Sequence, residues 1–239
     1  MAKLYFRYGA MGSGKSIDLL KVAYNYEERD GKVVLYTAAI DTRYGTGIIT
    51  TRIGINKEAI VFSKDTNILD SVKALEYKPD CILIDESQFL TKEQVSQIGD
   101  IVDYLNVPVI CYGLRTDFRG ELFEGSKELL AIADKIEEIK TICKCGKKAT
   151  YNMRLLDGKP VNKGEKILIG GNESYVSLCR KCYKESFKKN NLRWFGVGYF
   201  LYILKCIFKR SYFFKFKVKI FEFIFTGWEV IICKSMYEY

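Results

Sequence analysis

The stretch Gly9-Ala10-Met11-Gly12-Ser13-Gly14-Lys15-Ser16 decides the fold of this chain. It matches the phosphate-binding loop G-x-x-x-x-G-K-[ST], whose glycines let consecutive backbone N–H groups point at a phosphate. Residues 3–8 before it predict a strand, and the apolar spacing of residues 17–23 after it predicts a helix. In this context Lys15 is expected to reach the outer phosphates and Ser16 to hold magnesium. The alternative is a chance glycine-rich turn, but the flanking strand and helix favour a nucleoside triphosphate site.

A second motif lies at residues 81–86, where Cys-Ile-Leu-Ile is followed by Asp85 and Glu86. The apolar run predicts a buried strand, and a carboxylate at the end of a strand beside a phosphate loop commonly holds magnesium. We therefore expect Asp85 to share a magnesium ion with Ser16. The chain has no histidine, so Glu86 is the candidate base: for water in an ATPase, or for a substrate hydroxyl in a small-molecule kinase. The alternative is that Glu86 only caps the following turn.

Length and composition favour an intracellular enzyme over a secreted or membrane protein. The chain has 239 residues, of which 48% are hydrophobic, and it opens with no cleavable signal. Four of its eight cysteines form two tight pairs, while Cys81 and Cys111 lie in apolar, strand-like runs, which indicates free thiols rather than disulfides. We expect a cytoplasmic protein with one ordinary domain and a smaller one.

Strand-like and helix-like segments alternate up to about residue 142. Strands are expected at residues 33–36, 59–62, 81–84, 107–112 and 135–142, and helices at residues 68–75, 91–105 and 128–133. Thr91 and Gln94 have the spacing of a capping box. Such alternation predicts an α/β fold of the P-loop NTPase type, a mostly parallel sheet with flanking helices and ligands at the carboxyl ends of the strands. Residues 1–142 are expected to form this ATP-binding domain, whether it serves a kinase or an ATPase.

Residues 143–189 carry the two cysteine pairs, Cys143 with Cys145 and Cys179 with Cys182. Four thiolates presented on two turns suit a tetrahedral zinc ion, and a filled coordination sphere indicates a structural rather than a catalytic metal. The first pair is C-x-C rather than the commoner C-x-x-C, and free thiols are the alternative. This part of the sequence predicts a small zinc-binding domain.

Five motifs follow one another in order along the chain. They are the Met-containing phosphate loop, Asp-Thr-Arg-Tyr at residues 41–44, Asp-Glu-Ser-Gln-Phe at 85–89, Leu-Arg-Thr-Asp-Phe at 114–118, and the cysteine pairs around Gly-Gly-Asn-Glu-Ser-Tyr at 170–175. Over residues 1–189 the chain resembles the thymidine kinase family of many bacteria and of animal cytosol. The resemblance implies transfer of the γ-phosphoryl group of ATP to the 5′-hydroxyl of thymidine or deoxyuridine, giving dTMP or dUMP. It also implies Mg²⁺ and structural Zn²⁺ as cofactors.

The resemblance further implies roles for individual residues. Glu86 would accept the hydroxyl proton, Lys15 would contact the transferring phosphate, and Arg43 would position phosphate or neutralise nearby acids. The residues implied for ATP binding are Gly9, Ala10, Met11, Gly12, Ser13, Gly14, Lys15, Ser16, Asp85, Glu86, Ser87 and Gln88. The residues implied for the nucleoside are Met11, Phe89, Leu114, Phe118, Phe123, Asn152, Ile169, Gly170, Gly171 and Tyr175. Core packing is the alternative for each aromatic taken singly.

Two features of the implied nucleoside site concern the second domain, residues 143–189. Tyr175 and residues 169–171 would belong to a lasso-like loop that closes over the base. Asn152 stands where many relatives have threonine, and its amide can still donate to a pyrimidine oxygen. The resemblance also implies a homotetramer and inhibition by the end-product triphosphate.

The second class of function is a P-loop ATPase or ATP-binding module whose zinc lobe binds nucleic acid or protein. Lys159, Lys163 and Lys166 give that lobe some positive charge. The apolar residues 167–169, followed by Gly-Gly and then Tyr175, instead indicate a closing flap. We therefore favour the kinase and expect no nucleic-acid partner.

Residues 190–239 lie outside the resemblance. They hold eight Lys/Arg against three Asp/Glu, a net +5 of the chain's +9, and 16 of its 34 Phe, Tyr and Trp residues. The apolar run at residues 194–208 is shorter than the roughly 20 residues that a span needs, and Lys205 interrupts it. We expect an atypical basic and aromatic extension with no part in catalysis. Two alternatives for this extension are that it packs as an ordered part of the core or that it anchors the protein to a membrane or a partner. Membrane contact is not favoured.

Overall fold

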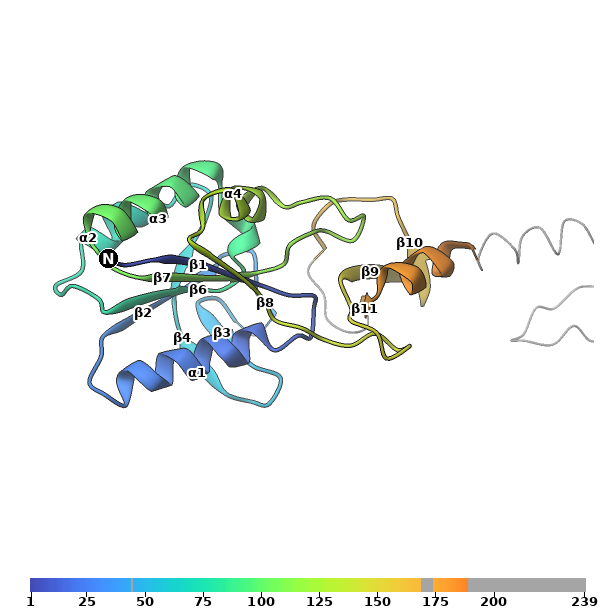
Figure 1. Cartoon of the computed structure of the whole chain (residues 1–239), viewed down its shortest axis with the longest axis horizontal. Coiled ribbons are helices and arrows are strands. Elements are labelled where there is room, and N and C mark those ends of the chain that lie inside the picture. Colours follow the sequence, from blue (N-terminus) through green and yellow to red (C-terminus); the bar gives the residue numbers. More distant parts are fainter. Residues whose placement is uncertain (44, 169–173, 189–239) are drawn as a thin grey trace, which may run out of the picture. The chain divides into compact units, whose positions relative to one another are not determined.

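The computed structural model describes residues 1–43, 45–168 and 174–188. The C-terminal extension and the expected nucleoside contacts Ile169, Gly170 and Gly171 therefore lie outside the described residues. The first part of the chain forms the predicted α/β fold around one six-stranded parallel sheet (Figure 1). Its strands, in their spatial order, are β5 (Ile60–Phe62), β2 (Val33–Ala38), β6 (Cys81–Ile84), β7 (Val109–Gly113), β1 (Leu4–Tyr8) and β8 (Lys135–Glu138).

Helices cover both faces of this sheet. Helix α1 (Lys15–Glu27) lies on one face, where Leu19 and Ala23 pack with Leu83 of β6. Helices α2 (Ile68–Lys73), α3 (Lys92–Tyr104) and α4 (Glu124–Ile132) lie on the other face (Figure 1). The central strands β6 and β7 are buried along their whole length, as expected for strands covered on both sides.

The predicted capping box at the start of α3 is confirmed. The Thr91 side chain accepts a hydrogen bond from the Gln94 backbone N–H, and the Gln94 side chain accepts from the Thr91 backbone N–H. Helix α4 begins four residues before the predicted helix. Its first turn contains Gly125 and Ser126, small residues that carry no apolar period. A Cβ at Gly125 would lie 2.5 Å from the Ser87 carbonyl oxygen, so this turn packs tightly against the short 3₁₀ helix η1 (Ser87–Phe89).

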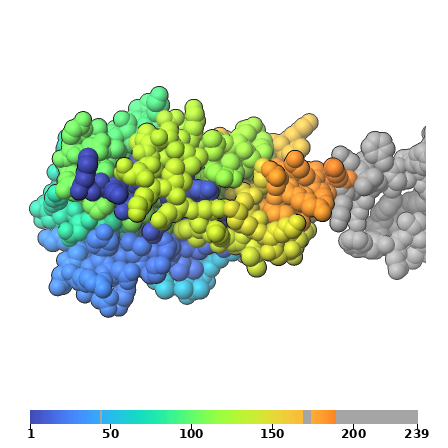
Figure 2. All heavy atoms as spheres, in the orientation of Figure 1, coloured from blue at the N-terminus to red at the C-terminus, as the bar shows by residue number. Residues whose placement is uncertain are grey.

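Two pieces of sheet were not predicted. A hairpin of β3 (Ile48–Thr50) and β4 (Asn56–Glu58) lies between β2 and β5 in the chain. The small lobe contains an antiparallel sheet in the order β10 (Lys159–Val161), β9 (Tyr151–Leu156) and β11 (Tyr175–Leu178), and residues 180–188 after it are helical. In Figure 2 the atoms of this lobe, coloured yellow to orange, adjoin those of the α/β domain. Among the described helices, none has the length and apolar character needed to cross a membrane.

Candidate active site

The phosphate loop connects β1 to α1, as its sequence predicts. Gly14 precedes the first residue of α1 with φ +86°, a backbone conformation that residues with a side chain adopt only with strain. The Gly9 N–H donates to the Gly113 carbonyl at 3.2 Å, which fixes the start of the loop at the carboxyl end of β7. The loop therefore presents its N–H groups and the N-terminus of α1 at the carboxyl edge of the sheet.

Lys15 is buried in this loop. Its ammonium group donates to the carbonyl oxygens of Gly9 and Ala10, each at 3.2 Å. Burial lowers the pKa of Lys15, and the nearby charges of Glu86 and Asp85 oppose that shift. The side chain thus holds a positive charge at the centre of the loop, facing the two acids that follow β6.

Asp85 is buried at the end of β6, where its Oδ2 accepts a 2.9 Å hydrogen bond from the Ser16 hydroxyl. Burial, together with the adjacent charge of Glu86, raises the pKa of Asp85 to about 7. A divalent cation bound here would favour the ionised form of this carboxyl group. The pair of oxygens that was expected to hold magnesium is therefore brought together in the fold.

Glu86 follows Asp85 with φ +51°, in the left-handed region. Its side chain makes no capping hydrogen bond to η1, which argues against the alternative that Glu86 only caps the turn. Instead Oε1 accepts from Arg43 Nη2 at 2.6 Å and Oε2 accepts from Gln88 Nε2 at 2.5 Å. A strained backbone and two side-chain partners fix this carboxylate, as is common at functional sites.

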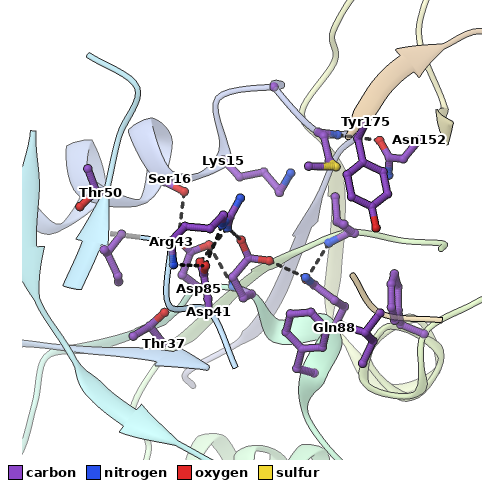
Figure 3. A pocket seen from close by; sticks show the side chains of 18 of the residues that line it. Lys15, Ser16, Thr37, Asp41, Arg43, Thr50, Asp85, Gln88, Asn152 and Tyr175 are labelled. Atoms are coloured by element: carbon purple, nitrogen blue, oxygen red, sulfur yellow. Dashed lines mark hydrogen bonds and ion pairs between the residues drawn. The ribbon is translucent and has the colours of Figure 1, made fainter. Parts of the chain in front are cut away.

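Arg43 reaches Glu86 from the loop after β2 and is itself held by Asp41. Its Nε and Nη2 each donate to an Asp41 carboxylate oxygen at 2.7 Å, the paired geometry that a guanidinium makes with a carboxylate. Figure 3 shows Lys15, Arg43 and Asp85 converging from different segments, with Asn152 and Tyr175 entering from the small lobe. Lys15 and Arg43 thus share one end of the site with the acids Asp41, Asp85 and Glu86.

One open cavity of ≈ 200 Å³ connects these groups. All described residues that were expected to contact the nucleoside line it, namely Met11, Phe89, Leu114, Phe118, Phe123, Asn152 and Tyr175. Eight of the residues expected to bind ATP also line it: Met11, Gly12, Gly14, Lys15, Ser16, Asp85, Glu86 and Gln88. Gly9, Ala10, Ser13 and Ser87 are not among its lining residues.

Further lining residues were missed by the sequence reading. Asp41 belongs to a quoted motif but received no role, and Thr37 lies at the end of β2. The hairpin contributes Arg52, whose guanidinium group lies beside Gly12 of the phosphate loop. No phosphate-binding pattern marks that hairpin; the only signal was a basic residue next to a glycine turn.

The small lobe forms two hydrogen bonds with the phosphate loop at Met11. The Met11 N–H donates to Asn152 Oδ1 at 2.8 Å, and the Met11 carbonyl accepts from the Ser177 hydroxyl at 2.5 Å. The Asn152 side-chain oxygen is thus occupied by the loop, while the donor capacity of the amide nitrogen, expected to serve a pyrimidine oxygen, is separate from this bond. Strands β9 and β11 therefore hold both backbone polar groups of one residue of the phosphate loop.

Tyr175 is held within the lobe by Arg154. The Tyr175 hydroxyl accepts from Arg154 Nε at 3.0 Å and Nη2 at 2.7 Å, and donates to the Leu168 carbonyl at 2.9 Å. The Arg154 guanidinium lies 3.9 Å from the centre of the Phe118 ring, a cation–π contact. Arg154 thus links the lobe tyrosine to an aromatic wall of the cavity.

The four cysteines of the lobe gather as predicted. The sulfur atoms of Cys143, Cys145, Cys179 and Cys182 all lie within 4.8 Å of one another, and Cys145 Sγ is 3.6 Å from Cys179 Sγ. A tetrahedral zinc ion with Zn–S bonds of about 2.3 Å separates its sulfurs by about 3.8 Å, so this donor set fits zinc. Burial opposes ionisation of Cys143, but hydrogen bonds from the Cys145 and Cys179 backbone, together with the Cys145 and Cys182 thiols, outweigh it and lower the pKa of that thiol to about 6. The C-x-C pair is therefore compatible with a metal centre.

Comparisons with known proteins agree on one family. A family model described as thymidine kinase matches residues 2–183. Curated relatives named thymidine kinase include one from Salmonella choleraesuis, 52% identical over 195 residues, covering 80% of this chain and 95% of the relative. A second, from Haemophilus influenzae, is 55% identical over 188 residues, covering 77% of this chain and 97% of the relative. A third, from Lactococcus lactis, is 56% identical over 184 residues, and it too covers 77% of this chain and 97% of the relative.

Proposed function

This chain belongs to the thymidine kinase family and acts as an ATP-using phosphotransferase on thymidine, and we propose that the 5′-hydroxyl is the acceptor. The products are then dTMP and ADP, and deoxyuridine is a second acceptor that gives dUMP. One observation carries the proposal: Glu86, Asp85 and Lys15 line the same cavity as the aromatic residues Phe89, Phe118 and Phe123. A phosphate site and an apolar site for a planar base are therefore continuous.

The phosphate loop binds the triphosphate in this proposal. Its N–H groups and the N-terminus of α1 contact the phosphates, while Lys15 neutralises charge on the transferring group. Ser16 and Asp85 hold magnesium through their oxygen atoms, which are already 2.9 Å apart. Magnesium neutralises charge on the phosphate oxygens when bound. Arg43, at 2.6 Å from Glu86, adds a second positive group on the acceptor side.

Glu86 takes the proton of the 5′-hydroxyl in this proposal. A carboxylate has about four acceptor positions, so the bonds from Arg43 and Gln88 leave capacity for a substrate hydroxyl. The transfer then proceeds in line and directly to the nucleoside, with no covalent enzyme intermediate. Positioning and charge neutralisation supply most of the rate in such reactions.

The nucleoside lies against Phe89, Leu114, Phe118 and Phe123, with Met11 toward the sugar and methyl side and Asn152 at the base. Phe89 and Phe123 contact each other edge to face, with ring centres 5.9 Å apart, which gives one wall a defined shape. Tyr175 and residues 169–171 close over the base. The same proposal divides the chain into three parts: residues 1–142, 143–189 and 190–239. The second part closes over the nucleoside.

Three further properties are proposed on the basis of the family. The cysteine cluster holds one structural zinc ion, supported by sulfurs within 4.8 Å of one another. The enzyme assembles as a homotetramer in the cytoplasm, and the end-product triphosphate inhibits it. Native mass measurement reports the assembly and the zinc content, and inhibition by dTTP is measured in the activity assay.

The central experiment supplies purified protein with Mg-ATP and, in separate reactions, thymidine, deoxyuridine, deoxycytidine or no acceptor. Nucleoside monophosphate and ADP are measured together. We expect monophosphate from thymidine and deoxyuridine, with ADP formed in equal amount, and a large loss of both in Glu86→Gln with ATP binding retained. Equal ADP formation without any nucleoside would contradict the proposal and identify an ATPase.

A further inference from the structure

We propose that Gln88 is a positioning residue for Glu86, an inference that rests on the proposed role of Glu86 as proton acceptor. Gln88 lies on η1, two residues after Glu86, and is only 2% exposed. Its amide bonds the Glu86 carboxylate at one end and the Leu114 N–H, just after β7, at the other, so it joins the acceptor of the proton to a wall of the nucleoside cavity. A buried glutamine amide must satisfy both of its ends, and here one end serves Glu86.

The two neighbours of this amide allow it only one orientation. Gln88 Nε2 donates to Glu86 Oε2 at 2.5 Å, and Gln88 Oε1 accepts from the Leu114 backbone N–H at 2.9 Å. An ionised carboxylate can only accept and a backbone N–H can only donate, so a reversed amide would lose both bonds. Leu114 therefore fixes the amide, and the fixed amide holds one oxygen of Glu86.

Gln88 completes a two-sided restraint on Glu86. Arg43 holds Oε1 at 2.6 Å, but the Arg43 side chain is 30% exposed and comes from a loop. Gln88 holds Oε2 from a buried position on the turn that also carries Glu86. With one partner on each oxygen, rotation of the carboxylate about its last bond is restricted. A carboxylate held in one plane keeps its remaining lone pair directed at one place, which proton transfer requires.

The end of β7 is shaped to receive this amide. A Cβ at Gly113 would lie 2.8 Å from Gln88 Oε1 and 2.7 Å from the Ser87 hydroxyl oxygen. Real Cβ atoms do not approach so closely, so glycine at this position is what allows the amide to lie against the strand. The contact is therefore built from the backbone of β7, the turn after β6 and a buried side chain.

Ser126 offers a matched control. Its hydroxyl donates to the Leu114 carbonyl at 2.5 Å, so Ser126 and Gln88 hold the two faces of the same residue. Ser126→Ala weakens the wall at Leu114 without removing a bond to Glu86. Gln88→Met removes both bonds of the amide at similar size. Gln88→Glu retains an acceptor for the Leu114 N–H but replaces the donor facing Glu86 with a carboxylate.

The test compares full-length wild type with Gln88→Met, Gln88→Glu, Ser126→Ala and Glu86→Gln. For each protein, kcat, the KM values for thymidine and ATP, ADP binding by calorimetry and the melting temperature are measured. We expect both Gln88 variants to lower kcat by about tenfold to a hundredfold, since they lose a hydrogen bond to a charged group. The resemblance implied a role for Gln88 in ATP binding, but its two side-chain hydrogen bonds go to Glu86 and Leu114. The KM for ATP and the affinity for ADP should therefore stay within about twofold. Ser126→Ala should raise the KM for thymidine with kcat retained.

Four outcomes would overturn the inference, and they are distinguishable. A wild type that does not phosphorylate thymidine, or a Glu86→Gln variant that keeps its turnover, removes the proposed function or the proposed base and this inference with it. If both of those hold but Gln88→Glu retains wild-type kcat, only the positioning role falls. An equal loss of kcat in Ser126→Ala shows that Gln88 acts through the Leu114 wall. If Gln88→Met has a much lower melting temperature, its loss of kcat could come from misfolding. The kcat of Gln88→Glu is then the deciding measurement, because that variant keeps the bond to Leu114.

Discussion

The Ser16 hydroxyl donates to the Asp85 carboxylate at 2.9 Å, and this bond joins the first turn of α1 to the end of β6. The two residues are far apart in the sequence, yet they bring two oxygen atoms to the place where the outer phosphates are expected. They supply hard oxygen ligands of the kind that magnesium prefers. The contact leads to the first prediction.

Asp85→Asn should lower kcat by about a hundredfold, because a neutral amide cannot balance the charge of the metal at the phosphates. It should also raise the magnesium concentration needed for half-maximal rate. A magnesium titration at saturating ATP measures both effects. Asp103→Asn, at an exposed position on α3, is the control and should behave like wild type. An unchanged magnesium requirement in Asp85→Asn would remove this residue from the metal site.

Arg43→Lys should lower kcat by about tenfold even though it keeps the positive charge. Lysine cannot reproduce the guanidinium geometry that contacts Asp41 and Glu86 together. Arg43→Ala should be more severe. Steady-state kinetics at saturating thymidine compares the two variants. Arg29→Lys is the control for replacing arginine with lysine, because in the described part of the chain the Arg29 side chain bonds only the Asn25 carbonyl on the surface. Equal rates for wild type and Arg43→Lys would show that charge alone matters.

Ser177→Ala should raise the KM values for thymidine and for ATP by about twofold to tenfold, the range expected for one lost hydrogen bond. The reason is that Ser177 holds the carbonyl of Met11, a residue of the phosphate loop that also lines the nucleoside cavity. Ser186→Ala serves as the control, because within the described residues its hydroxyl bonds the Cys182 carbonyl and not the phosphate loop. An effect confined to thymidine would argue that the loop does not transmit the change.

Cys145→Ser should abolish the bound zinc, which elemental analysis of wild type should report as about one ion per chain. The lobe has a small apolar core, with Ala149, Met153 and Leu178 among its buried residues, so loss of the metal should lower the melting temperature and the affinity for thymidine. Cys111→Ser, in a buried strand away from the cluster, should retain zinc even if it lowers stability. Full zinc content in Cys145→Ser would exclude this cysteine as a ligand.

Truncation after Lys189 should leave kcat and both KM values within about twofold of the full chain. The family match ends at residue 183, and among the residues that the structure describes, those lining the cavity extend to Tyr175. Activity of the truncated and full-length proteins is measured at equal concentration of folded protein. A folded truncation that has lost its activity would show that the extension contributes to catalysis.

Local signals in the sequence were sufficient for the parts of the fold that rest on local chemistry. The glycine-rich loop, the buried run of β6 and the capping box at Thr91 and Gln94 each appear in the structure where the pattern predicted them. The cysteine spacing likewise predicted a cluster. In each of these cases the residues of one short segment are enough to explain the structure that the segment adopts.

Other features depend on contacts between distant segments. The hairpin was not predicted because β4 is the polar run Asn-Lys-Glu, with no alternation. Strand β9 buries Asn152 and Arg154, and polar residues inside a strand do not indicate a core. The hydrogen bonds of Gln88 follow from the left-handed backbone at Glu86, which no composition rule predicts for a glutamate. Such relationships become visible only when the tertiary contacts are known.

The hydrogen bonds between the small lobe and Met11 have a consequence for protein engineering. Asn152 and Ser177 bond the two sides of a single loop residue, and Asn152 also lines the cavity for the base. A redesign of β9 or β11 for a different nucleoside would therefore alter the loop that holds the phosphate donor. Selection for a new acceptor should recover compensating substitutions near Met11, because in this fold acceptor preference and donor affinity are not separate design variables.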